Sequence, residues 1–273
     1  MSIRTDLVTE EITSLKEGFI TSKETIDNTE IETTEIKSDE ASNRIGKPKG
    51  KYCTIRFDRL DTLSETAPIK SAIVYSLKKI AGTYKNALVV GLGNTDITPD
   101  SLGPFCVNSV IATRHITSEI KKDLGLENLN TVACLIPGVL GKTGIEAVDI
   151  IKSAVNRISP DLVIVIDALA ARTPENLCRT IQMSDSGIAP GSGVKNERKA
   201  LNKETLGVPV IAIGIPTVID ANALSDGLGG TDDMMVTPKE IDLLISRSSA
   251  LLSRAINIFL QPSLDEDTIE CLS

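Results

Sequence analysis

The sequence predicts an α/β protein, a three-layer α/β/α sandwich with a mainly parallel sheet, preceded by a small β-rich region. Short, wholly apolar runs such as Leu162–Ile166 are typical of central strands that are covered on both faces. These runs alternate with helical patterns over residues 65–262, which favours helices on both sides of a sheet. The chain is 41% hydrophobic but only 3% aromatic. Its core must therefore consist mainly of Val, Ile, Leu and Ala, which suits a parallel sheet.

Residues 7–64 differ from the rest of the chain and predict the β-rich region. Thr25–Lys37 spaces Ile among Thr and Glu, a pattern compatible with exposed strands. Lys51–Phe57 alternates more regularly and places three apolar side chains on one face of a strand. A Lys-Pro-Lys-Gly turn at residues 47–50 separates the two segments. We therefore expect a β layer ahead of the α/β core.

The first elements of the core follow from apolar spacing and from one proline. Ala67–Ile80 repeats apolar residues at helical spacing along one face. Ala87–Leu92 is an apolar run of strand length. Pro104 is favoured in the first turn of a helix, so we expect a helix over Pro104–His115.

The middle of the core repeats this alternation. Thr131–Ile136 is an apolar strand segment that runs into a glycine-punctuated loop. Gly144–Ile158 carries Ile and Val on one side at helical spacing, which predicts a second covering helix. Leu162–Ile166 is then the most apolar strand of the chain. Strand, helix and strand in this order predict a parallel pair with a crossover.

The last elements are two strands and two helices. Arg179–Ser184 and the fully apolar Val208–Ile215 are expected to be strands. Thr217–Leu224 is expected to begin a helix. The final helix is expected over Pro238–Leu260, because Thr237 can act as its N-cap and an acid three residues later completes a capping box. Residues 263–273 remain as a C-terminal tail.

Composition excludes several classes of function. A net charge of −8 and a pI near 4.9 argue against direct binding to nucleic acid. Five scattered cysteines without a Cys-x-x-Cys pair fit reduced thiols in a cytoplasm. The N-terminus has no apolar signal core, and no membrane-spanning run is expected. We expect neither a metal nor a cofactor. A single histidine excludes sites with two His ligands, and no pair of cysteine and histidine residues has the spacing of zinc ligands.

Asp100 and Asp167 are the best clue to chemistry, because each follows an apolar strand segment. Catalytic groups of open α/β sheets lie at the carboxyl ends of strands, so the two acids could share one crevice. Two carboxyl groups held close together cannot both ionise cheaply, and one ionised and one protonated acid suit hydrolysis. In the alternative, Asp100 caps a helix and Asp167 accepts hydrogen bonds from loop amides. The residue pattern alone favours neither.

Two glycine-containing loops offer weaker signals. Gly91–Asn94 resembles the start of a dinucleotide-binding turn, but Asp96 stands where the third glycine belongs, which disfavours nucleotide binding. Asn94 stays a candidate supporting residue of the acid pair. Lys142, in the loop Gly138–Gly144, could help to stabilise an oxyanion, although a simple tight loop is favoured.

Two further side chains are candidates for support. Arg172 lies five residues after Asp167 and either orients that acid or forms a surface ion pair. His115 is more simply a packed or hydrogen-bonded helix residue than the base of a serine triad. The nucleophile elbow G-x-S-x-G that such a triad often uses is absent around Ser192.

Long motifs of this chain resemble the germination proteases of spore-forming bacteria. They cover about residues 87–260 and include GLGNTDITPDSLGP, IPGVLGKTGIEAVDII, PDLVIVIDALAAR, TIQMSDSGIAPGSGVKN and MVTPKEID. The resemblance implies a fold like that of the hydrogenase-maturation peptidases. It also implies an endopeptidase that degrades small acid-soluble spore proteins during germination, in the cytoplasm of the forespore and spore core.

The resemblance further assigns roles to single residues. Asp100 and Asp167 match the two catalytic acids of the family, which makes the enzyme aspartic in type. Family members are homotetramers and self-processing zymogens. The R-T-D-L match implies that residues 1–6 are a propeptide, cleaved between Asp6 and Leu7.

Two departures and two alternatives accompany this interpretation. Only about a dozen residues separate PTVIDA from MVTPKEID, where the family often carries a longer insertion, and residues 8–45 match poorly. One alternative is a hydrogenase-maturation-type peptidase that recognises a metal, which the lone His115 disfavours. The other is a non-catalytic module that binds a nucleotide or an anion through its glycine loops.

Overall fold

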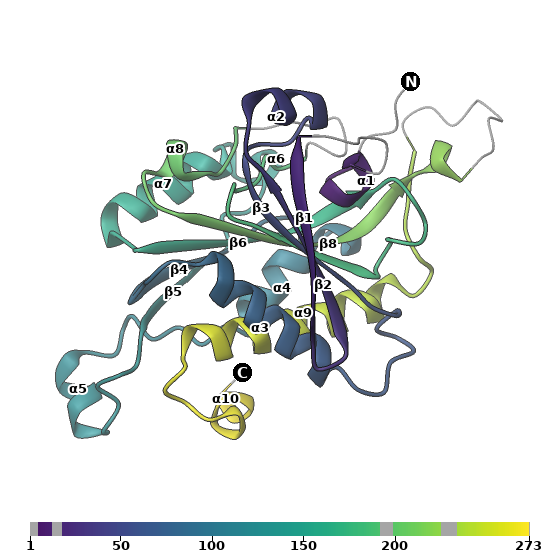
Figure 1. Cartoon of the computed structure of the whole chain (residues 1–273). Coiled ribbons are helices and arrows are strands. Elements are labelled where there is room, and N and C mark those ends of the chain that lie inside the picture. Colours follow the sequence, from purple (N-terminus) through teal and green to yellow (C-terminus); the bar gives the residue numbers. More distant parts are fainter. Residues whose placement is uncertain (1–4, 13–17, 192–198, 225–233, 273) are drawn as a thin grey trace.

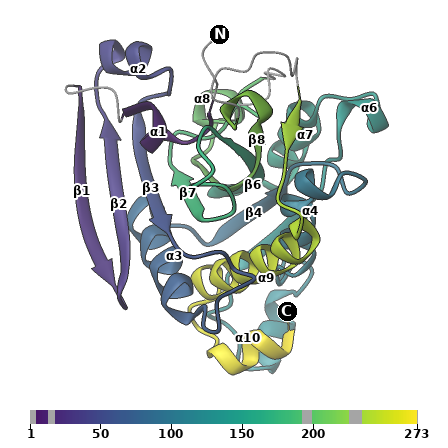
Figure 2. The same cartoon turned by 90° about the vertical axis from the view of Figure 1, so that its right-hand side faces the viewer.

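A computed structural model describes residues 5–12, 18–191, 199–224 and 234–272 of the chain. Their strands form one nine-stranded mixed sheet (Figures 1 and 2). In sheet order the strands are β1 Phe19–Ile26, β2 Thr29–Ile36, β3 Gly50–Arg56, β7 Thr180–Ser184, β8 Val210–Asp220, β6 Leu162–Ala171, β4 Asn86–Gly91 and β5 Thr131–Leu135, and β9 Met235–Val236 pairs with β8.

The sheet has a parallel half and an antiparallel half. Strands β8, β6, β4 and β5 run parallel to one another, as the alternating pattern of the core predicts. Strands β1, β2, β3 and β7 join them through antiparallel pairs. The α/β class is confirmed, and the parallel arrangement applies to the half that carries the two aspartates.

Helices cover both faces of the sheet and complete three layers (Figure 1). One face packs on α3 Ala67–Ile80, α4 Leu102–Asn108 and α9 Ile241–Leu260, around the larger apolar core. The other face packs on α7 Ala147–Ile158 and α8 Lys203–Leu206, around a second core. The remaining helical segments are α1 Val8–Ile12, α2 Asp39–Ile45, η1 Thr98–Asp100, α5 Ser118–Asp123, α6 Leu140–Thr143, η3 Ala221–Ala223 and α10 Glu266–Leu272.

The N-terminal β-rich region is continuous with this sheet, because β3 pairs with β7. Strands β1 and β2 form a hairpin whose turn residues Asp27 and Asn28 have φ of 46° and 65°, as tight hairpin turns require. Strand β3 was expected to place its apolar side chains on one face. It buries both faces, since Cys53 and Ile55 join the core with α3 while Tyr52 packs near α1 and α2.

Two expected helices differ from the structure, one in its end and one in most of its residues. The helix predicted over Pro104–His115 ends at Asn108, because the backbone N–H groups of Thr113 and Arg114 donate to Val132 and draw the chain toward β5. His115 therefore lies in an exposed turn. The first four residues of the helix predicted over Thr217–Leu224 are instead the end of β8, which continues to pair with β6 and β9. Only Ala221–Ala223 are helical, as the short 3-10 helix η3.

The C-terminal elements also differ from expectation. Helix α9 begins at Ile241 rather than at Pro238, and Thr237 does not cap it, because its hydroxyl donates to the Thr217 carbonyl (2.7 Å). Glu240 pairs with Arg59 (2.8 Å) instead of completing a capping box. Helix α9 is long and apolar enough to cross a membrane by length and composition, yet 67% of its most apolar 18-residue window is buried and it packs as a core helix. Residues 266–272, expected in a tail, form α10 against it.

Candidate active site

Asp167 lies inside β6, and not after its end as the sequence predicts. The neighbouring strand β4 ends there instead, with Gly91 opposite Ile166. The Leu92 amide makes one further hydrogen bond to the Ile166 carbonyl (2.8 Å), and the chain then leaves the sheet. Asp167 is 6% exposed. The departure of β4 thus leaves this buried acid beside the loop that carries Asp100.

Asp100 is held close to the end of β4 by a loop that closes on itself. The Asn94 amide donates to the Asp100 carbonyl (3.0 Å). Gly93 has φ of +120°, and a Cβ placed on it would lie 1.8 Å from that carbonyl oxygen. The Thr217 hydroxyl donates to the Pro99 carbonyl (2.7 Å) and ties the loop to β8. Only glycine at position 93 allows this approach.

Both aspartates line one cavity of about 480 Å³. Glu146 and Ala147, at the start of α7, also line it. The amino end of a helix carries partial positive charge, which favours a carboxylate nearby. Glu146 was not among the predicted site residues, although it belongs to the same motif as the loop Gly138–Gly144. Other lining residues include Leu92, Val139, Leu169, Pro190, Lys199 and Leu201.

The supporting candidates lie around the cavity rather than in it. The Asn94 side chain accepts from the Asp96 amide (3.1 Å) and so shapes the Asp100 loop. Lys142 is exposed and forms an ion pair with Asp96. Neither Lys142 nor His115 is among the described residues that line the cavity, whereas Gly138 from the predicted oxyanion loop is.

Arg172 contacts the N-terminal segment of the chain. Its guanidinium forms an ion pair with Glu11 (2.5 Å) and donates to the Glu10 carbonyl (3.2 Å). Its backbone amide donates to the Glu10 carboxylate (2.7 Å). The arginine thus fixes the segment that contains the expected cleavage site.

The Asp6–Leu7 peptide bond lies on β6, beyond the point where β4 leaves it. The Asp6 amide donates to the Ala170 carbonyl (2.9 Å), and the Ala170 amide donates to the Asp6 carboxylate (2.8 Å). Leu7 is fully buried and packs against Leu169. Asp6 lines the same cavity as Asp100 and Asp167. The structure therefore brings the expected cleavage site and the two expected catalytic acids to one place.

A buried carboxylate anchors the chain downstream of that bond. Glu10 is 8% exposed. Its carboxylate accepts from the Thr173 amide (3.0 Å), the Thr173 hydroxyl (3.1 Å) and the Asn176 side chain (2.8 Å), in addition to the Arg172 amide. The Thr5 hydroxyl also donates to it. A charged acceptor with this many donors is a strong attachment point.

Burial shifts the pKa of four cysteine thiols. Burial raises the pKa of Cys178 to about 12 and that of Cys134 to about 11, so both thiols stay protonated at neutral pH. Burial also raises the pKa of Cys53 and Cys106. In the described ranges no group of three or more His, Cys, Asp or Glu side chains is placed to hold a metal ion.

A family model described as "Germination protease" matches residues 1–229. The chain belongs to the germination protease family. It is therefore a peptidase of spore germination, and the family resemblance of its motifs is confirmed.

Curated members of the family match most of the chain. The germination protease of Caldanaerobacter subterraneus subsp. tengcongensis is 38% identical over 97% of this chain and 96% of its own length. That of Clostridium perfringens (strain ATCC 13124) is 36% identical over 96% of each chain. That of Geobacillus sp. (strain WCH70) is 41% identical over 82% of this chain and 65% of its own length. The first alignment spans 314 positions against 273 residues here, so that relative contains residues that this chain lacks.

A solved structure with some likeness is the [NiFe] hydrogenase maturation protease HycI from Thermococcus kodakarensis KOD1. It is 17% identical, with a TM-score of 0.38, over 66% of this chain and 98% of that one. A likeness of this degree carries no argument about function.

Proposed function

We propose that the chain is an aspartic-type endopeptidase in which Asp100 and Asp167 activate one water molecule. The observation that carries the proposal is the single cavity that both acids line. The ionised acid takes a proton from the water as the water oxygen attacks the peptide carbonyl carbon. The protonated acid gives its proton to the leaving amine, and the C–N bond breaks. Two like charges in one site favour this division of roles.

We further propose that the chain is a zymogen that removes residues 1–6 by cutting between Asp6 and Leu7. The position of Asp6 in the cavity with both acids supports this, as does the anchoring of Glu10 on the downstream side. Because Leu7 is fully buried, residues from Leu7 onward would stay in the fold after the cut.

The proposed substrates are the small acid-soluble spore proteins, degraded in the cytoplasm of the forespore and spore core, and the proposed assembly is a homotetramer. Family membership supports these finer statements. A chain with net charge −8 would be repelled by bare DNA, which fits an enzyme that acts on DNA-coating proteins without binding nucleic acid itself.

Intact-mass analysis of the purified chain in mildly acidic buffer tests the proposal. Wild type should lose its first six residues, and both Asp100→Asn and Asp167→Asn should retain them while their circular dichroism stays unchanged. Asp96→Asn is the matched control, because Asp96 lies on the same loop but pairs with exposed Lys142. Normal processing in both site variants would refute the two-aspartate mechanism.

A further inference from the structure

The Gln182 side chain on β7 makes hydrogen bonds to the backbone on either side of Leu7, at Asp6 and at Val8. Its side-chain nitrogen Nε2 donates to the Asp6 carbonyl oxygen (3.0 Å), which is the carbonyl of the bond expected to be cut. Its side-chain oxygen Oε1 accepts from the Val8 amide (2.7 Å). A backbone amide can only donate, so the second bond fixes which end of the Gln182 amide faces Asp6. The N–H group is therefore aimed at that carbonyl.

Gln182 and Asp167 lie in one row across three strands. Strand β8 places Gly214 opposite Asp167 on one side and opposite Gln182 on the other. Paired residues point to the same face, and adjacent strands lie about 4.8 Å apart, so the two backbones are separated by about 10 Å. Gly214 contributes no side chain to the space between them. The Leu169 side chain occupies part of that space and packs against Leu7.

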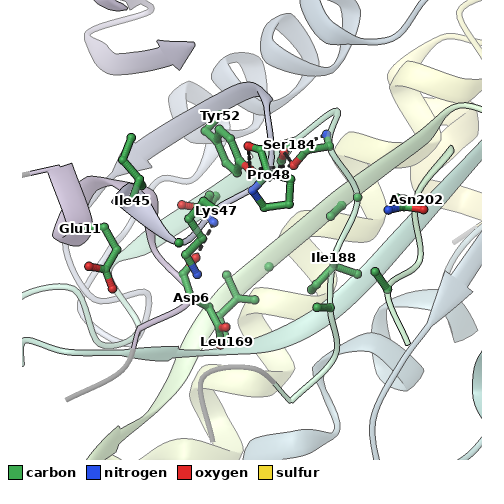
Figure 3. A pocket seen from close by; sticks show the side chains of 18 of the residues that line it. Asp6, Glu11, Ile45, Lys47, Pro48, Tyr52, Leu169, Ser184, Ile188 and Asn202 are labelled. Atoms are coloured by element: carbon green, nitrogen blue, oxygen red, sulfur yellow. Dashed lines mark hydrogen bonds between the residues drawn. The ribbon is translucent and has the colours of Figure 1, made fainter. Parts of the chain in front are cut away.

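Asp6 thus accepts a hydrogen bond from Gln182 at its carbonyl oxygen and lines one cavity with the buried acid Asp167. Gln182 is 9% exposed and lines a second cavity of about 760 Å³, which shares Asp6 and Leu169 with the first. Figure 3 shows this second cavity, with Asp6 between Leu169 and Lys47. A buried, oriented N–H group beside a reacting carbonyl is the arrangement that stabilises negative charge on the carbonyl oxygen.

We propose that Gln182 is a further catalytic residue, the donor that stabilises the oxyanion when the Asp6–Leu7 bond is hydrolysed. This inference rests on the proposed function, since it names the group that acts on the same bond. Water adds to the Asp6 carbonyl carbon, the electron pair moves to the carbonyl oxygen, and Gln182 Nε2–H strengthens its hydrogen bond to that oxygen. The pair returns as the C–N bond breaks. The products are the Asp6 carboxylate and the Leu7 amine.

Two substitutions of Gln182 separate an oxyanion donor from a structural contact. Gln182→Glu keeps an acceptor for the Val8 amide but, when ionised, loses the donor to Asp6. Gln182→Met keeps the approximate size and removes both polar contacts. At pH 7 we expect each variant to lose residues 1–6 about 100-fold more slowly than wild type, as measured by intact mass over time. Ser184→Ala, on the same face of β7 and lining the same cavity, is the control and should stay within about twofold.

The pH profile gives the decisive readout. In Gln182→Glu, protonation of the introduced carboxylate restores an O–H donor. The rate deficit of this variant should therefore shrink to about tenfold or less as pH falls from 7 to about 4, because burial raises the pKa of the introduced carboxyl group and it is protonated within that range. Gln182→Met should keep its deficit across that range. Rates of both variants within about threefold of wild type at pH 7, or a deficit of Gln182→Glu that does not change with pH, would overturn the assignment. Failure of wild type to process at all would instead refute the proposed function.

Discussion

The parallel and antiparallel halves of the sheet supply different parts of the site. The parallel half carries the two acids, Asp167 within β6 and Asp100 in the loop after β4. The antiparallel half carries groups that hold the N-terminal segment, among them Gln182 on β7 and Lys47 just before β3. The difference suggests a division of labour. Substitution of either acid should abolish bond cleavage. Substitution of Gln182 should slow cleavage through loss of the oxyanion donor, whereas substitution of Lys47 should mainly misplace the peptide.

Gly93→Ala should have the largest effect of a residue outside the acid pair. A Cβ at this position would lie 1.8 Å from the Asp100 carbonyl, and φ of +120° strains any side chain. The Asp100 loop must therefore move, and we expect self-processing to slow by about 100-fold or more. Intact mass over time measures this. Gly82→Ala, where the added Cβ has open space, is the control. Equal rates in the two variants would mean that the position of Asp100 is unimportant.

Among the contacts that anchor the N-terminal segment downstream and upstream of the cut, Glu10→Gln should have the larger effect, on stability as well as on rate. Its amide would place N–H donors against the N–H groups of Arg172 or Thr173, which now donate to the carboxylate. We expect the free energy of unfolding to fall by about 2 kcal/mol in urea titrations, and processing to slow by about tenfold. Glu11→Gln is the matched control, because its partly exposed ion pair contributes less than about 1 kcal/mol. A larger loss of unfolding free energy in Glu11→Gln than in Glu10→Gln would show that Glu10 is not the main anchor.

Lys47→Met should have a smaller effect, confined to processing. The Lys47 ammonium donates to the Thr5 carbonyl (2.8 Å), just upstream of the expected cut. Burial lowers the pKa of Lys47, while the carboxylates of Asp6 and Glu11 oppose that shift. Loss of one charged hydrogen bond should slow processing by about fivefold to tenfold. Lys49→Met, which removes an exposed ion pair with Asp39 from the same loop, should process normally.

The acid pair was predictable because its signal is local. An apolar run that ends in an acid can be found in one short window, as at Asp167. The exact placement was not predictable, since β6 continues past Asp167 and the site is made by the end of β4. Where β4 ends beside β6 depends on the pairing between the two strands, which lie far apart in the sequence. Strand pairing also explains the error at Thr217–Leu224, which was predicted to begin a helix. Its first residues stay in β8 because they pair with β6 and β9.

The side chains that bind the N-terminal segment, such as Gln182 and Lys47, gave little local signal in the sequence. Gln182 bonds to residues 174 and 176 positions away in the sequence, so no window around it reveals the contact. Gly214 was the one available hint. An isolated glycine within an apolar strand often marks a close approach of another chain segment. The R-T-D-L match located the expected cut but not the strand on which it lies.

The rates of self-processing in wild type, Asp100→Asn, Asp167→Asn and the double variant test the central claim most directly. If the two acids act as one unit on one water, each single substitution should slow the loss of residues 1–6 by about 1000-fold or more, and the double variant should be no slower than the singles. Effects that multiply in the double variant, or normal processing in either single variant, would contradict a shared site.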